Sequence, residues 1–256
     1  MDARLILTIA CLSAAPALAQ GFDHAHQAWD ALVKKHVVVL PGGNASQLRY
    51  AELARDRAAL KAYLDSLSKV SRAQFDGWAK PERKAFLVNA YNAFTVEKIL
   101  TRYPDIRSIW DFGRIFGNPF KDDFFTLLGR RMTLDGIEHE TLRKPGAYDD
   151  PRIHYAVNCA ATGCPMLREE AYVAARLEAQ LDEQAVRFLS DRSRNRFREG
   201  RLEVSNIFDW FKEDFEPRVQ YFARYAKLLD YPGGAVPITF LDYDWALNDS
   251  RSSSRR

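Results

Sequence analysis

Cysteine is scarce in this sequence, and it has no internal repeat and no long linker rich in proline, glycine or serine before its last residues. The chain has 256 residues and three cysteines, of which only Cys159 and Cys164 lie beyond the first twenty positions. Without a repeat or a linker, one domain over residues 20–248 is the simplest organisation. Hydrophobic residues make up 47% of the chain, which is enough for one sizeable core and argues against disorder.

Long apolar runs are also missing from most of the chain. Beyond residue 19 no segment approaches twenty apolar residues, so we expect no stable membrane span. The N-terminus differs, because Arg4 precedes the apolar run "LILTIACLSAAPALA" and Ala17-Leu18-Ala19 offers small residues for a cleavage site. We therefore predict a secretory signal peptide over residues 1–19, cut before Gln20, and a periplasmic or secreted protein.

The body of the chain lacks net charge. The formal charge is +3, but three arginines lie in the C-terminal stretch "NDSRSSSRR", and without them the body is neutral. A neutral body is poor evidence for nucleic-acid binding, so we expect no nucleic-acid partner. Residues 249–256 are predicted to form a flexible basic tail. The arginine-rich stretch "DRSRNRFREGRLEV" favours a solvated hairpin that turns near Glu199-Gly200, with binding of an anionic ligand or envelope surface as the alternative.

Hydrophobic spacing predicts a helix-rich α+β single domain, with a small and mainly antiparallel sheet assembled from distant segments. The stretch "RIHYAVNC", residues 152–159, alternates loosely and predicts a strand, and "PITFLDYDWALN", residues 237–248, predicts a closing strand. Apolar residues at helical spacing predict helices over residues 23–37, 55–70, 80–103, 133–144, 173–190, 205–216 and 219–230.

The most strongly predicted helix is "KPERKAFLVNAYNAFTVEKILTRYP", with Pro81 in its first turn and Pro104 after its end. Its centre is apolar almost all round, so the helix should be buried. Asn89 and Asn92 then share a face of a buried helix, where an unpaired amide costs roughly 1–3 kcal/mol. Two interpretations stay open: these amides hold neighbouring loops in place, or they line a functional site.

Five further stretches occur in the order "FLVNAYNAFTVEKIL", "TLDGIEHETLR", "DPRIHYAVNCAATGCPML", "SNIFDWFKEDF" and "LDYDWALND". Together they resemble a family of domains of unknown function, DUF547, over roughly residues 22–248. The resemblance implies the fold of that family, which occurs in exported bacterial proteins and in plant proteins, and it implies little about activity. One departure is Arg49, because the family tends to have an acidic residue before the tyrosine that matches Tyr50. The family pattern falls on Asn89, Tyr91, Asn92, Glu138, His139, His154, Cys159, Cys164 and Pro165.

The two cysteines admit several interpretations. A Cys159–Cys164 disulfide suits an exported protein and would stabilise it by on the order of 2–3 kcal/mol, but the family pattern allows serine at the second position. A thiol nucleophile needs a nearby base or cation, and His139 or His154 is the candidate. On a regular strand His154 and Cys159 point to opposite faces, so a direct pair needs a bulge, or the base is His139.

Three other interpretations of the cysteines carry less weight. A zinc site fits poorly, because the close Cys-Cys or His-His pairs of such sites are missing. A dithiol redox protein is a further alternative, although C-x4-C is not the usual redox spacing. Buried, inert cysteines in a core are the last.

From these residues we predict a cysteine-dependent hydrolase or transferase that acts on amide, peptide or thioester bonds, papain-like or transglutaminase-like in its logic. Cys159 is the predicted nucleophile. Either His154 or His139 is the base, and Glu138 orients it. The predicted substrate-binding residues are Asn89, Tyr91, Asn92, Arg143 and Cys164. We expect a small-molecule or peptide substrate, no metal and no cofactor; the rival hypothesis is a non-enzymatic envelope module held by a Cys159–Cys164 disulfide.

Overall fold

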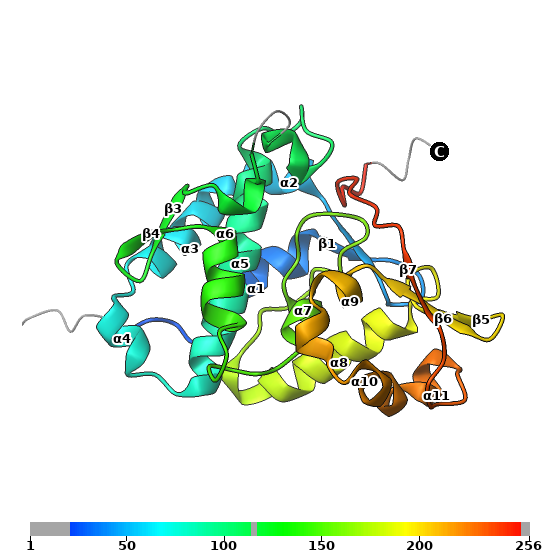
Figure 1. The fold of residues 1–256 in the computed structure, drawn as a ribbon. Coiled ribbons are helices and arrows are strands. Elements are labelled where there is room, and N and C mark those ends of the chain that lie inside the picture. The colour runs from blue at the N-terminus through cyan, green and yellow to red at the C-terminus, as the bar shows by residue number, and fades with distance from the viewer. Residues whose placement is uncertain (1–20, 114–116, 252–256) are drawn as a thin grey trace, which may run out of the picture.

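A computed structural model describes residues 21–113 and 117–251 of the chain. The predicted signal peptide lies outside the described residues, as do residues 252–256 of the predicted tail (Figure 1). The helices are α1 Gln27–His36, α2 Tyr50–Leu53, α3 Arg57–Ser68, α4 Arg72–Asp76, α5 Lys80–Leu100, α6 Leu134–Ile137, α7 Ile153–Ala156, α8 Leu177–Ser190, α9 Ile207–Trp210, α10 Arg218–Arg224 and α11 Ala226–Leu229. The strands are β1 Val37–Val39, β2 Ser46–Leu48, β3 Phe125–Leu127, β4 Arg130–Met132, β5 Arg196–Arg198, β6 Arg201–Ser205 and β7 Ile238–Leu241.

Helix α5 runs through the middle of the molecule, with α6 beside it (Figure 1). Its first turn is stabilised by Glu82, whose carboxylate accepts the N–H of Ala79 at 2.8 Å, and by Pro81, whose missing N–H needs no partner there. Every residue from position 84 to position 96 is buried, so the apolar run forms the centre of the main core. The prediction of a long buried helix is confirmed.

Within the part of the chain that the structure describes, the strands form three small sheets. The pairs β1–β2 and β3–β4 are antiparallel hairpins, while β5, β6 and β7 form a sheet in which β6 pairs antiparallel with β5 and parallel with β7. The predicted turn of the arginine-rich hairpin lies at Glu199 and Gly200, both with positive φ, as a tight hairpin turn requires. The predicted helix-rich α+β class with small, mainly antiparallel sheets is confirmed.

The strand predicted over residues 152–159 is wrong. Residues Ile153–Ala156 form helix α7, and the chain becomes extended only at Val157. The Asp-Pro step before it explains the difference, because Asp150 accepts the N–H of Arg152 at 3.0 Å and Pro151 holds a helical φ. The alternation argument that placed His154 and Cys159 on opposite faces therefore does not apply.

The C-terminal segment returns across the molecule after β7. Residues 249–251 remain attached to the domain, because the N–H of Ser250 donates to Leu48 of β2 at 3.1 Å and the Tyr103 hydroxyl donates to Asp249 at 2.9 Å. Residues 249 and 250 therefore contact the body of the domain. Within residues 21–113 and 117–251, no helix is both long and apolar enough to cross a bilayer.

Candidate active site

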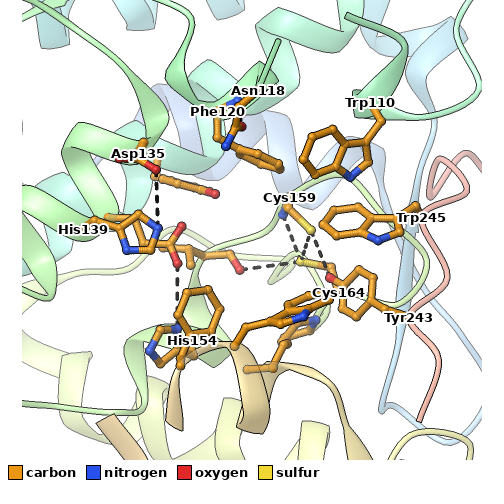
Figure 2. A pocket seen from close by; sticks show the side chains of 17 residues that line it. Trp110, Asn118, Phe120, Asp135, His139, His154, Cys159, Cys164, Tyr243 and Trp245 are labelled. Atoms are coloured by element: carbon orange, nitrogen blue, oxygen red, sulfur yellow. Dashed lines mark hydrogen bonds and ion pairs between the residues drawn. The ribbon is translucent and has the colours of Figure 1, made fainter. Parts of the chain in front are cut away.

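A pocket of about 440 Å³ opens beside the loop that follows α7 (Figure 2). Its wall brings together side chains from segments far apart in the chain, and sulfur, imidazole, carboxylate and aromatic groups all face it. The lining residues are Tyr91, Trp110, Asn118, Phe120, Asp135, Glu138, His139, His154, Val157, Cys159, Cys164, Pro165, Ile207, Trp210, Phe211, Tyr243 and Trp245.

The loop from residue 157 to residue 165 carries both cysteines, and buried amides fix its course. Asn92 of α5 donates to the carbonyl of Ala156 at 2.9 Å and accepts the N–H of Asn158 at 2.8 Å. Asn158 in turn donates to the carbonyl of Pro165 at 2.8 Å, which closes the loop on itself. Because these groups are buried and fully engaged, the sulfur atoms are held on a rigid frame.

The C-terminal segment covers one side of this loop. Thr162 donates its N–H to Ala246 and Gly163 donates its N–H to Asp244, each at 2.8 Å. A side chain at Gly163 would come within 2.9 Å of the backbone of Asp244, so only glycine allows this close approach. The pairing brings Tyr243 and Trp245 to the pocket, more than 75 residues after the cysteines in sequence.

The two sulfur atoms lie against each other as free thiols. Cys159 is half-buried and Cys164 is 6% exposed. The distance between their Sγ atoms is 2.9 Å, the N–H of Cys159 also donates to Cys164 Sγ at 2.9 Å, and the Tyr243 hydroxyl lies 3.1 Å from Cys159 Sγ. Cys164 Sγ is therefore an acceptor for two groups of Cys159.

These contacts separate the acidities of the two thiols. Burial, and then the neighbouring Cys164 sulfur, raise the pKa of Cys159 well above its ordinary value. Burial acts in the same direction on Cys164, but the S–H and N–H of Cys159 stabilise its thiolate and lower the pKa of Cys164. When the pair loses its first proton, the negative charge rests mainly on Cys164.

The opposite wall comes from the segment that follows α6. The side chain of Thr133 caps α6 by accepting the N–H of Gly136 at 2.8 Å. The helix then widens into a π-helical turn, Glu138–Leu142, in which the N–H of Arg143 donates to the carbonyl of Glu138 at 2.8 Å. Such turns are frequent at functional sites, and this one presents Glu138 and His139 to the pocket.

His154 lies between two carboxylates. Its Nε2 is 2.6 Å from Asp214 Oδ2, and its Nδ1 is 3.8 Å from Glu138 Oε1, which is longer than a hydrogen bond. The ring stacks on Phe211 at 4.3 Å between centroids, and 1% of the side chain is exposed. Asp214 thus orients the imidazole, and Nδ1 is the nitrogen that a bound group in the pocket can use.

Asp214 joins His154 to Arg143, because it also accepts a hydrogen bond from Arg143 Nε at 2.5 Å. Burial alone would raise the pKa of Asp214, but the hydrogen bonds from His154 and Arg143 outweigh it and lower the pKa to about 2. Arg143 also contacts Nδ1 of His139, whose Nε2 lies 3.6 Å from Asp135. This wall is consequently a network of charges in fixed positions.

Tryptophan side chains form the mouth of the pocket. Trp110 is 36% exposed and Trp210 is 42% exposed, although both are large apolar groups. Trp245 contacts both rings, stacking with Trp210 at 5.6 Å and meeting Trp110 edge-on at 5.3 Å between centroids. Exposed aromatic groups that surround a pocket favour the docking of an apolar or planar group.

Residues 75–189 match the model of a family described as "Protein of unknown function, DUF547". This match supports the assignment of the chain to the DUF547 family. No curated protein and no solved structure matches the chain. The matched residues include both cysteines, Glu138 and both histidines of this DUF547 site, while Asp214 and the C-terminal aromatic residues lie beyond them.

The structure places most of the predicted site residues of this DUF547 chain at one pocket. The pocket lining includes the predicted catalytic residues Cys159, His154, His139 and Glu138, and also Cys164 and Tyr91. Burial, and then the neighbouring carboxylate of Glu138, raise the pKa of Tyr91 well above its ordinary value. Among the described residues, no hydrogen bond joins Cys159 to a histidine.

Three predicted substrate-binding residues of the DUF547 site lie behind the lining. Asn89 donates to the carbonyl of Tyr172 at 2.7 Å and accepts its N–H at 3.0 Å, so its amide holds a loop. Asn92 holds the cysteine loop in the same way. Because both amides are engaged with the backbone, neither is available as an oxyanion donor. Arg143 pairs with Asp214 and supports the histidine wall, which is the side of the pocket formed by Glu138, His139 and His154.

Sequence reasoning missed Asp214, Tyr243 and the role of the tryptophans in this DUF547 site. The first two lie in the quoted stretches "SNIFDWFKEDF" and "LDYDWALND", and their place in the ordered motifs was the available signal. Among residues 21–113 and 117–251, no group of three or more His, Cys, Asp or Glu side chains is arranged to hold a metal ion.

Proposed function

We propose that this protein is a thiol-dependent acyl hydrolase or transferase that acts on amide, peptide or thioester bonds. The observation that carries the proposal is the sulfur pair: a half-buried thiol at a pocket, 2.9 Å from a second sulfur whose pKa is lowered. A nucleophilic thiol needs a proton acceptor within hydrogen-bond reach, and Cys164 meets that condition for Cys159.

The chemistry follows from these positions. Cys159 Sγ attacks the carbonyl carbon while its proton passes to the Cys164 thiolate, and the Tyr243 hydroxyl donates to the developing oxyanion. Collapse of the tetrahedral intermediate breaks the bond to the leaving group, which takes a proton from Cys164. Water or an acceptor amine then attacks the acyl-Cys159 thioester, releases the acyl group and returns the thiol.

The histidine wall acts on the substrate from the other side of the pocket. His154, oriented by Asp214, has Nδ1 available as an acid–base group for the leaving group or the attacking water. The tryptophan mouth holds an apolar part of the substrate. In this mechanism Cys159 is the nucleophile and His154 is the acid–base group. His139 and Arg143 are positioning residues.

Acetylation by phenyl thioacetate tests the proposal. The purified chain should acquire one acetyl group on Cys159, located by mass spectrometry of peptides, faster than a short cysteine peptide does, and should turn the reagent over. Cys159→Ala should lose both signals, and the exposed control Ser193→Ala should keep them. Acetylation of Cys159 no faster than that of the free peptide, or unchanged turnover in Cys159→Ala, would sink the proposal.

One observation favours a second function, that of a non-enzymatic binding module. The same 2.9 Å contact leaves the sulfurs of Cys159 and Cys164 close enough to be joined by oxidation. Export through the predicted signal peptide, which stays a prediction, would bring the pair to a compartment where disulfides persist. Alkylation of the freshly isolated exported protein separates the two functions, because a disulfide blocks labelling of Cys159 until a reductant is added.

A further inference from the structure

A second groove, of about 830 Å³, lies on the other side of the π-helical turn from the pocket. It is bounded by α4, the start of α5, the β3–β4 hairpin and the loop 144–148, at the end of the molecule away from β5–β7 (Figure 1). Its lining includes four cationic side chains, Arg72, Arg83, Arg130 and Lys144. This concentration of positive charge contrasts with the neutral body of the chain.

Two of these guanidinium groups meet at one aromatic ring. The Cζ atoms of Arg72 and Arg83 lie 5.9 Å and 6.0 Å from the centre of the Phe75 ring. Tyr148 lines the same groove; burial raises its pKa, and the charges of Arg83 and Arg72 oppose that rise. Positive charges gathered around one ring are stabilised by a bound anion.

Arg83 has a hydrogen-bond donor that lacks an acceptor among the described residues. Its Nε is buried and has no hydrogen-bond partner within residues 21–113 and 117–251. Arg72 differs, because its Nε donates to both oxygens of Asp76 at 2.8 and 2.9 Å. Among the described residues Arg83 also forms no ion pair with a carboxylate, so its guanidinium, unlike that of Arg72, has its charge available to an anion in the groove.

The carboxylates at the groove do not neutralise its positive charge. Glu140 is the acidic residue of the lining and lies 4.0 Å from Arg130, and Asp76 pairs with Arg72 beside the groove. Four cations therefore face two carboxylates, which leaves an excess of two positive charges. A phosphomonoester carries between one and two negative charges at neutral pH, and its oxygens match the fork of donors of a guanidinium.

We propose that this groove is a binding site for a phosphate group, with Arg83 as its central ligand. The site is separate from the cysteine pocket and does not depend on the proposed activity. The phosphate group could belong to a free phosphate compound or to the phosphomonoester headgroup of a lipid. The same four cations would bind it in both cases. Below about pH 6 the ligand loses one negative charge, so binding should weaken there while the arginines stay charged.

Titration calorimetry of the full chain with inorganic phosphate at pH 7.5 and low salt tests the site. Wild type should bind, and Arg83→Gln should bind at least tenfold more weakly. Arg201→Gln, the same change on an exposed arginine of β6, is the matched control and should leave binding unchanged. No binding by wild type, or equal binding by Arg83→Gln and wild type, overturns the proposal.

Sedimentation with vesicles distinguishes the two sources. Vesicles of phosphatidylcholine with phosphatidic acid should retain wild type but not Arg83→Gln if the ligand is a lipid headgroup, and phosphatidylcholine alone should retain neither. Binding of inorganic phosphate without vesicle retention identifies a free phosphate compound. Thermal unfolding shows whether Arg83→Gln is folded; if it is not, the rim variant Arg130→Gln/Lys144→Gln replaces it, and unchanged phosphate binding by that variant overturns the proposal.

Discussion

The sulfur wall and the histidine wall of the pocket hold their protons in different ways. On the sulfur wall, Cys159 donates its S–H to Cys164 Sγ at 2.9 Å, and the pKa of Cys159 is raised while that of Cys164 is lowered. On the histidine wall, Asp214 is bound to both His154 and Arg143, and its pKa is lowered to about 2. The S–H···S hydrogen bond gives the proton of Cys159 a direct path to a second sulfur, whereas strong ion pairs fix charge and position.

This difference indicates which wall reacts and which wall positions. The nucleophile is expected where the proton is mobile, at Cys159. The opposite wall is expected to act through orientation, since Asp214 holds Nε2 of His154 at 2.6 Å and Nδ1, 3.8 Å from Glu138, can reach a bound group. If the comparison is right, changes to the two walls should have effects of different kinds: on thiol reactivity for one, and on stability and acid resistance for the other.

The largest effect is expected from Cys164→Ser. Serine can still accept the N–H of Cys159, but its hydroxyl is not ionised and cannot take the proton of the nucleophile. With the base lost, alkylation of Cys159 by iodoacetamide at pH 7 should slow by about 100-fold, in the range of general-base effects. Rates measured from pH 6 to pH 10 separate the loss of the base from the accompanying fall in the pKa of Cys159, which the Cys164 sulfur no longer raises. An unchanged rate at pH 7 would mean that Cys164 is not the base.

A smaller effect, on stability, is expected from Asp214→Asn. Loss of this carboxylate removes charged hydrogen bonds to His154 and Arg143, so the free energy of unfolding at pH 7 should fall by about 2 kcal/mol. Because the pKa of Asp214 is about 2 in the folded state and ordinarily 3.8, its contribution is complete above pH 4 and is lost as the pH falls toward 2.

Urea unfolding at pH 7, 4 and 2.5 measures both parts of that prediction. The gap between wild type and Asp214→Asn should narrow by about 1 kcal/mol between pH 4 and pH 2.5, after allowance for solvent screening. Asp150→Asn is a matched control, because the pKa of Asp150 is also lowered to about 2 but its partners are Lys84 and Arg152, away from the cysteines. A constant gap, or slower alkylation of Cys159 in the control, would contradict the division between the walls.

Much of the fold was predictable because local patterns decide it. The spacing of apolar residues predicted α5 and α8, and the Glu199-Gly200 turn predicted the β5–β6 hairpin. The wrong prediction of a strand at residues 152–159 also has a local cause, since a short apolar stretch is compatible with either a strand or a buried helix. The Asp-Pro step at residues 150–151 favours the helix.

The site was predictable only where residues with distinctive chemistry lie in short motifs. Cysteine and histidine are rare, so Cys159 and His154 could be singled out from the sequence. Asp214 is one of many acidic residues, and its partners are 60 and 71 positions away. Trp210 and Trp245 have the same apolar signature at a pocket mouth as in a core, and only the packing of distant segments separates the two cases.

The smallest effect is expected from Tyr243→Phe, which sharpens the comparison within the sulfur wall itself. Burial raises the pKa of Tyr243 well above its ordinary value, so the hydroxyl keeps its proton. It can then donate a hydrogen bond to the thiolate, because its oxygen lies 3.1 Å from Cys159 Sγ. Loss of one such hydrogen bond, about 1 kcal/mol, should slow alkylation of Cys159 at pH 7 by roughly fivefold.

Tyr231→Phe is the control for that change, because its buried hydroxyl has no hydrogen-bond partner among the described residues. It should leave the alkylation rate unchanged. If Tyr243→Phe raised the rate instead, the hydroxyl would be shielding the sulfur and not stabilising the thiolate. The assignment of Tyr243 as the oxyanion donor would then be wrong, while Cys159 could remain the nucleophile.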